Sequence, residues 1–240
     1  MDKDLVFLSS RSNDELQAIA DILVFDAKGR KLLLETLSKR KSYVANYPNN
    51  MKDVLPDIVD ELQRCGGNKI RNLLRGHGVS YREMLMDVCK KVNVNFHKDN
   101  TTELIERYLL QKMLATAAGK MTDEDVKHIS NKFNKAEDLK NVLSSSKIAL
   151  PLMIRMTSII LVNISKQIGT KVLAGAIAKF AGGRLMSMLA GPVGWAIGGI
   201  WTTYDLLGPS YKRMLPAAIT IAYYRLLDTA TAEEKAEAFE

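Results

Sequence analysis

Apolar residues recur along most of the chain at spacings of three and four, the period of an amphipathic helix. Within residues 12–24, Leu16, Ile19, Ile22 and Leu23 fall on one helical face. No two neighbouring segments alternate apolar and polar residues as paired strands do. The pattern predicts an all-α protein, a multi-helix bundle with a polar N-terminal portion and a glycine-rich, apolar C-terminal helical hairpin region.

Capping motifs mark several of the predicted helix starts. Ser12 stands three residues before Glu15, and Ser80 stands three residues before Glu83, which is the spacing of a capping box. Residues 228–240 are acidic, and we expect them to be frayed. The predicted helices cover residues 12–24, 31–39, 54–65, 68–75, 81–92, 100–118, 122–133, 136–143, 147–168, 171–181, 184–190, 193–207 and 214–227.

The amino-acid composition of the chain changes after Ser144-Ser145-Ser146. Nine of the fifteen glycines lie between Gly169 and Gly208. We therefore predict a short N-terminal helical domain over residues 1–45 and a charged helical domain over residues 46–146. Residues 147–240 then form a glycine-rich, apolar helical region with an acidic tail.

The net charge of +7 is spread unevenly. Residues 147–227 hold nine basic residues against the single acid Asp205, in the most apolar part of the chain. Basic charge beside apolar sequence favours an anionic membrane surface over a nucleic acid. Aromatic residues make up only 7% of the chain, too few for a base-stacking surface, so we expect no nucleic-acid partner.

The residues that carry enzyme chemistry are sparse. Cys65 and Cys89 form no CxxC pair, and His77, His97 and His128 lack metal-ligand spacing. There is no Walker loop and no GxSxG nucleophile elbow. We therefore expect no catalytic residues, no metal site and no cofactor. The small number of cysteines also indicates a reducing compartment, and we expect the protein in the cytoplasm. There we expect it to be peripheral to, or conditionally inserted in, the inner membrane.

One block of sequence resembles a known family. The run from Glu61 to Gly78, continuing through Tyr81-Arg82 and Leu85-Met86-Asp87-Val88, resembles the uncharacterised bacterial YaaW-like family. Asp4-Leu5-Val6-Phe7-Leu8 is similar to the short N-terminal domain of that family, and Gly191-Pro192-Val193-Gly194 is similar to its C-terminal end. Sequence profiles relate the family's middle block to ubiquinol–cytochrome c chaperones. The resemblance thus implies a helical, non-catalytic assembly role for a membrane-protein client.

The motif Arg75-Gly76-His77-Gly78 is the sharpest local feature. Arg75, His77, Tyr81 and Arg82 are candidate anion- or ligand-binding residues, because they surround the N-terminus of the helix predicted from residue 81. The alternative is a tight interhelical turn, in which the glycines serve geometry and the arginines pair with nearby acids. The sequence leaves both interpretations open.

Residues 185–204 form an uncharged stretch between Arg184 and Asp205. Twenty helical residues span about 30 Å, the thickness of a hydrocarbon core. Gly194 and Gly198 form a GxxxG motif, which lets helices approach closely. Three interpretations remain: a buried hairpin of a helical domain, conditional insertion as in a pore-former, or a constitutive span.

The leading functional hypothesis is a non-enzymatic protein that engages an anionic membrane surface or an apolar protein helix through its C-terminal half. One alternative is an assembly chaperone for a membrane-protein client. Another is a soluble anion-binding, ligand-binding or enzymatic module centred on the turn at Arg75 and His77. The candidate contact residues are Gly191, Pro192, Gly194, Trp195, Gly198 and Trp201 for close packing or insertion, and Arg184, Lys212 and Arg213 for electrostatic attraction.

Overall fold

The computed structural model describes residues 1–26, 28–33, 35–66, 78–129, 133, 135–145, 148–179, 208 and 210–239. Throughout these ranges the fold is all-α, as predicted, and the only extended pairing is an isolated antiparallel bridge between Phe25 and Lys31. Residues 171–179 are also helical. The other helices are η1 (Lys3–Ser10), α1 (Asn13–Val24), η2 (Leu37–Lys39), α2 (Lys41–Asn46), α3 (Leu55–Cys65), α5 (Tyr81–Lys91), α6 (Thr102–Ala118), α7 (Asp123–Ile129), α8 (Ala136–Ser144), α9 (Leu150–Gln167), α12 (Tyr211–Thr229) and α13 (Ala232–Phe239).

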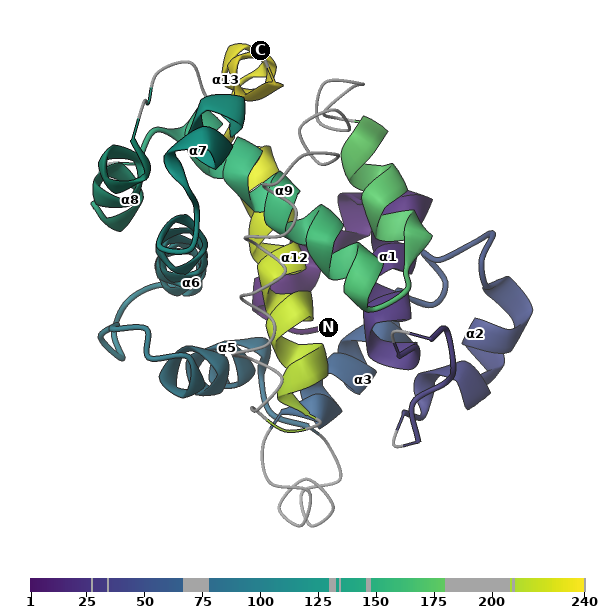
Figure 1. The fold of residues 1–240 in the computed structure, drawn as a ribbon. Helices are drawn as coiled ribbons and strands as arrows, with labels where there is room; N and C mark the ends of the chain where they lie inside the picture. The colour runs from purple at the N-terminus through teal and green to yellow at the C-terminus, as the bar shows by residue number, and fades with distance from the viewer. Residues whose placement is uncertain are drawn as a thin grey trace.

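Helix α12 is the central element of the bundle. It contacts α1, α3, α5, α6 and α9, and Figure 1 shows it crossing the middle of the molecule between teal α6 and purple α1. Residues 213–224 of α12 are buried without interruption. A helix that is apolar on all sides is enclosed by its neighbours, which explains this central position.

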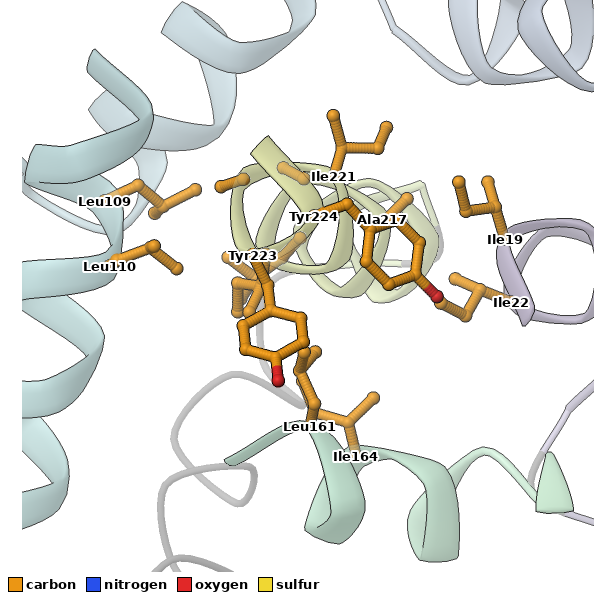
Figure 2. Packing of buried hydrophobic residues seen from close by; sticks show 14 of the residues in the cluster. Ile19, Ile22, Leu109, Leu110, Leu161, Ile164, Ala217, Ile221, Tyr223 and Tyr224 are labelled. Atoms are coloured by element: carbon orange, nitrogen blue, oxygen red, sulfur yellow. The ribbon is translucent and has the colours of Figure 1, made fainter. Parts of the chain in front are cut away.

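Two adjacent tyrosines of α12 show how the helix is enclosed. The ring of Tyr223 points toward Leu161 of α9, whereas Tyr224 lies on the side of Ile22 of α1 (Figure 2). Both tyrosine side chains are fully buried, and each hydroxyl has a partner. The Tyr223 hydroxyl shares a 2.8 Å hydrogen bond with Ser158, and the Tyr224 hydroxyl donates to the Glu15 carbonyl at 3.3 Å.

The three predicted segments share one hydrophobic core. Helices α9 and α12 of the third segment pack against α6 of the second, and α12 also contacts α1 of the first. Buried residues from all three segments belong to the same cluster. Of the described helices, none has both the length and the apolar character required to cross a membrane.

The predicted capping boxes are confirmed at α1 and α5. The Ser12 hydroxyl accepts from the Glu15 N–H at 3.3 Å, and the Ser12 N–H donates to the Glu15 carboxylate at 2.8 Å. The Ser80 hydroxyl accepts from the Glu83 N–H at 3.2 Å, with the reciprocal bond also formed. Each cap satisfies donors that the first helical turn would otherwise leave unpaired.

The helix predicted over residues 31–39 is wrong for most of its length. Among the residues of this stretch that the structure describes, only Leu37–Lys39 is helical, as a 3-10 turn. The Asp26 carboxylate accepts the N–H groups of Lys28 at 2.8 Å and Arg30 at 2.9 Å, which closes a tight turn. The chain then doubles back along the end of α1, where the Leu32 N–H donates to the Val24 carbonyl at 2.8 Å. A side-chain turn therefore overrides the helical periodicity.

The prediction of a frayed C-terminal tail is also wrong. Residues 232–239 form α13, which packs on α9 near the C-terminus marked in Figure 1. Its start has a capping box that the sequence analysis missed, between Thr231 and Glu234. Arg155 of α9 holds its far end by donating to the carbonyls of Ala238 at 2.6 Å and Glu237 at 3.1 Å.

Candidate functional site

The structure describes two of the four predicted anion-site residues, Tyr81 and Arg82, while Arg75 and His77 lie outside the described residues. Tyr81 opens α5, and its side chain is 0% exposed. Its hydroxyl donates to the Glu106 carboxylate at 2.7 Å. The Tyr81 hydroxyl therefore lies in the protein interior.

Asp2 supplies the negative charge at the N-terminus of α5. Its carboxylate accepts the Tyr81 N–H at 2.7 Å, the Gln63 side-chain amide at 2.9 Å and the Asp4 N–H at 3.0 Å. A helix N-terminus attracts anions because its N–H groups and dipole point outward. At this helix the chain's own carboxylate takes that place.

Arg82 extends toward the loop between α5 and α6. Its guanidinium donates to the Lys98 carbonyl at 2.7 Å, to the Asn100 carbonyl and to the Thr102 hydroxyl at 3.2 Å. The Tyr81 side chain thus binds Glu106 in the interior, whereas the Arg82 side chain binds the loop between α5 and α6. The anion-site prediction rests on Arg75 and His77 and stays a prediction.

The Tyr81 hydroxyl belongs to a buried polar cluster, which we call the Glu106 cluster and define as Tyr81, Glu106 and Arg225. Glu106 of α6 is 2% exposed and also accepts from the Nε of Arg225 of α12 at 2.7 Å. The Arg225 guanidinium donates as well to the Asp4 carbonyl and lies 4.1 Å from the centre of the Phe7 ring. The cluster therefore ties η1, α5, α6 and α12 together.

Burial governs the protonation of Glu106. It raises the pKa of this carboxyl to about 7, although Arg225 and the Tyr81 hydroxyl both oppose the shift. Burial also raises the pKa of the Tyr81 hydroxyl well above its ordinary value. Glu106 is thus the member of the cluster that can exchange a proton near neutral pH.

A small pocket opens beside the Glu106 cluster, between α6 and α12. Its volume is about 130 Å³. Both charged members of the cluster, Glu106 and Arg225, reach its wall, which also carries apolar side chains. The lining includes Glu103, Glu106, Arg107 and Leu110 of α6 and Arg225 and Leu226 of α12.

A second buried ion pair holds the start of α12. Arg213 is 8% exposed and lies 3.3 Å from the Glu61 carboxylate of α3, with a further bond to the Leu23 carbonyl at 3.4 Å. Glu61 also accepts from the Thr36 hydroxyl at 2.6 Å. Arg213, a predicted membrane-attracting residue, therefore directs its charge into the protein, whereas Lys212 is exposed.

The remaining predicted contact residues lie in a part of the chain that the structure does not describe. They are Arg184, Gly191, Pro192, Gly194, Trp195, Gly198 and Trp201.

The helix of residues 171–179 precedes that part of the chain. Polar contacts at both of its ends join it to α1. Asp21 of α1 accepts from the Thr170 hydroxyl at 3.4 Å, just before the helix begins. Lys179 at its far end pairs with Asp14, which lies seven residues before Asp21 and so on the same side of α1. Burial raises the pKa of Asp21 to about 6, while the hydrogen bonds from Tyr47 and Thr170 oppose the shift.

The raised pKa of Asp21 predicts a pH-dependent stability. Because the folded-state value lies above the unfolded one, the carboxyl adds stability at low pH and loses it as pH rises through about 6. When the pH is raised from roughly 5 to 7.5, the free energy of unfolding of Asp21→Asn should increase by about 1 kcal/mol relative to that of the parent. Urea unfolding at both pH values measures this difference. Asp14→Asn, a partly exposed position on the same face, is the control, and an equal pH effect there would contradict the assignment to Asp21.

The helical periodicity did not identify the charged residues that organise the interior. Glu106 falls on the apolar stripe of α6, four residues before Leu110, and Glu61 falls between Ile58 and Leu62 on the buried face of α3. A charged residue at a core position of an amphipathic helix is the signal that could have identified them.

Metal and thiol chemistry find little support in the described part of the chain. No group of three or more histidine, cysteine or acidic side chains there is placed to hold a metal ion. Cys65 and Cys89 are both buried, and burial raises the pKa of each thiol to about 12. Neither thiol is therefore available as a thiolate near neutral pH.

Comparison with known proteins places the chain in a family. A UPF0174 protein of Helicobacter pylori strain J99 is 34% identical over 241 residues, which cover 98% of this chain and 95% of the relative. The chain belongs to the UPF0174 family. YaaW, the UPF0174 protein of Escherichia coli K12, is 30% identical over 96% of both chains, which confirms the YaaW-like resemblance. Residues 1–33 match a family described as a domain of unknown function, DUF3944.

These UPF0174 relatives come from bacteria, and none of the names above is that of an enzyme. No solved structure shows significant similarity to the chain.

Proposed function

We propose that this UPF0174 protein is a non-enzymatic helical protein that engages an anionic membrane surface or an apolar protein helix through residues 147–240. The proposal puts it in the cytoplasm, peripheral to or conditionally inserted in the inner membrane. The observation that carries it is the uncharged stretch of residues 185–204, which is long enough to lie across or along a hydrocarbon layer.

The described helices on either side of this stretch support the proposal. The helix of residues 171–179 is fastened to α1, and α12 is enclosed in the core. A contact made by residues 185–204 would therefore leave the packing of α9 and α12 intact. Such a contact would cost less than an insertion that pulls core helices out of the protein.

The ion pairs of the C-terminal half refine the electrostatic part of the proposal. Lys179, Arg213 and Arg225 pair with acids of residues 14–106, so their charge is balanced within the protein. The exposed lysines Lys166 and Lys171 flank the turn that precedes residues 171–179. We assign the attraction to an anionic surface to these two lysines, while Lys212 and Arg184 stay predicted contributors from the sequence.

Tryptophan fluorescence tests the proposal selectively, because the only two tryptophans of the chain, Trp195 and Trp201, both lie in the stretch. With vesicles that contain phosphatidylglycerol, we expect cosedimentation and a blue shift of the emission. Vesicles of phosphatidylcholine alone should bind less, because the attraction from the basic residues is missing.

Charge reversal provides the matched comparison. Lys166→Glu with Lys171→Glu should weaken vesicle binding by roughly tenfold or more, since each lysine near an anionic surface contributes about 1 kcal/mol. Lys41→Glu with Lys52→Glu changes the net charge equally at exposed positions of the N-terminal half and should bind like the parent. Unchanged emission with both vesicles and an apolar helical peptide would overturn the proposal.

A further inference from the structure

We propose that the pocket between α6 and α12 binds a small monocarboxylate, and that Glu106 takes up one proton from solvent when the ligand enters. This inference is independent of the membrane proposal, because it rests on α6, α12 and the Glu106 cluster.

Two guanidinium groups supply the anion recognition. Arg225 gives its Nε–H to Glu106 and one Nη group to the Asp4 carbonyl, while its Nη1 lies 3.8 Å from the Glu103 carboxylate, beyond hydrogen-bond distance. Arg107 lines the same pocket, and among the described residues its guanidinium makes only a long 3.5 Å hydrogen bond to the Ile148 carbonyl. Both arginines therefore retain donors for a carboxylate.

The rest of the pocket indicates a short apolar chain on the ligand. Leu110, Ala222 and Leu226 line it beside the arginines. The volume of about 130 Å³ is close to that of an engineered cavity of about 150 Å³ that holds benzene. A carboxylate of about six non-hydrogen atoms, such as butyrate, fits this volume and matches both walls. Inorganic phosphate would set polar oxygens against the leucines without hydrogen-bond partners.

The charges around the pocket couple the ligand to a proton. The lining holds two arginines and two glutamates, so its net charge is zero when all four groups are ionised. A bound carboxylate would add an uncompensated negative charge, which protonation of Glu106 removes. Burial already raises the pKa of Glu106 to about 7, so this proton is available at small cost.

The groups that act on Glu106 are few. From α5 they are the Tyr81 hydroxyl and the Cys89 thiol, and from α12 the Arg225 guanidinium. On α6 itself Glu103 acts on its charge, and Arg107 shares the pocket wall. On the η1 side, Arg225 meets the Asp4 carbonyl and the Phe7 ring, neither of which titrates. Of the carboxyls on the pocket wall, Glu106 is the one whose pKa lies near 7. The pKa of Glu103 is lowered, mainly by a backbone hydrogen bond and to a smaller extent by Thr101 and Arg225.

Titration calorimetry with butyrate near pH 6 and pH 8, in buffers of different ionisation enthalpy, tests both parts of the proposal. We expect uptake approaching one proton per butyrate near pH 8 and little uptake near pH 6, where most of Glu106 is already protonated, with an affinity that falls toward tenfold per pH unit above about pH 7. Glu106→Gln, which can keep the hydrogen bonds of the cluster, should bind with no pH dependence. Butyrate binding near pH 8 without proton uptake would overturn the coupling.

A substitution at the pocket wall tests the site itself. Arg107→Ala should weaken butyrate binding at least tenfold while the melting temperature stays at the parent value, because the loss of one charge-assisted bond is worth about that factor. Lys112→Ala, at an exposed position of the same helix, should bind like the parent. Equal binding by Arg107→Ala, equal binding of butanol or phosphate, or no binding at about 50 mM butyrate near pH 6 would overturn the proposal.

Discussion

Arg225→Ala is expected to lower the free energy of unfolding by about 3–5 kcal/mol near pH 8, because it leaves the Glu106 carboxylate buried without its cation. The Tyr81 hydroxyl alone would then balance a charge that is 2% exposed. Protonation of Glu106 removes that charge, so the deficit should shrink as pH falls below about 7. Urea unfolding of parent and variant near pH 8 and pH 5 measures both effects.

Arg107→Ala is the matched control for this prediction. Arg107 lines the same pocket as Arg225 but pairs with no described carboxylate, so its loss should change stability by no more than about 0.5 kcal/mol. If Arg225→Ala loses the same free energy at both pH values, the Arg225 side chain stabilises the fold through its packing on Phe7 instead.

Gly78→Ala is expected to destabilise the protein by about 3 kcal/mol through a steric clash with α3. A Cβ atom at this position would lie 2.3 Å from the Gln63 carbonyl carbon and 2.6 Å from the Arg64 nitrogen. Both are backbone atoms, so no side-chain rotation relieves the overlap. The chain would have to move away from α3 and lose the 3.3 Å bond from the Val79 N–H to the Gln63 carbonyl.

Gly175→Ala provides the opposite case on the same denaturation assay. Gly175 lies inside the helix of residues 171–179, and a Cβ atom there would meet nothing within 4 Å. Alanine should therefore add about 0.5–1 kcal/mol of stability through its lower backbone entropy. A Gly78→Ala variant as stable as the parent would contradict the close approach to α3. The outcome bears directly on the turn interpretation, since Gly78 is the last glycine of the motif that begins at Arg75.

Local sequence rules worked where the deciding interactions lie within one turn of a helix. Ser12 and Ser80 each reach a backbone N–H three residues on, so the starts of α1 and α5 follow from the sequence. The same rule would have identified α13 from Thr231 and Glu234. The capping rule did not predict the turn at Asp26. There a carboxylate that accepts hydrogen bonds from nearby backbone N–H groups competes with helix formation, and the two conformations have similar free energies.

The charge distribution shows the limit of reading a segment by itself. Residues 147–227 look like a strongly basic surface, yet Arg213 is buried beside Glu61 and Arg225 is half-buried beside Glu106. Their partners stand more than a hundred residues earlier in the chain. No periodicity or spacing within either segment shows which acid meets which arginine.

The sequence by itself determined the helical class of this protein, most of its helix starts and its family, because these depend on short-range spacing and on residue-by-residue similarity. Only the tertiary structure decided that Asp2 covers the N-terminus of α5 and that Glu106, Tyr81 and Arg225 form a buried cluster beside a pocket. These contacts join residues brought together by the packing of η1, α5, α6 and α12. The free energy of a buried charge depends on its surroundings in space, which a linear pattern does not contain.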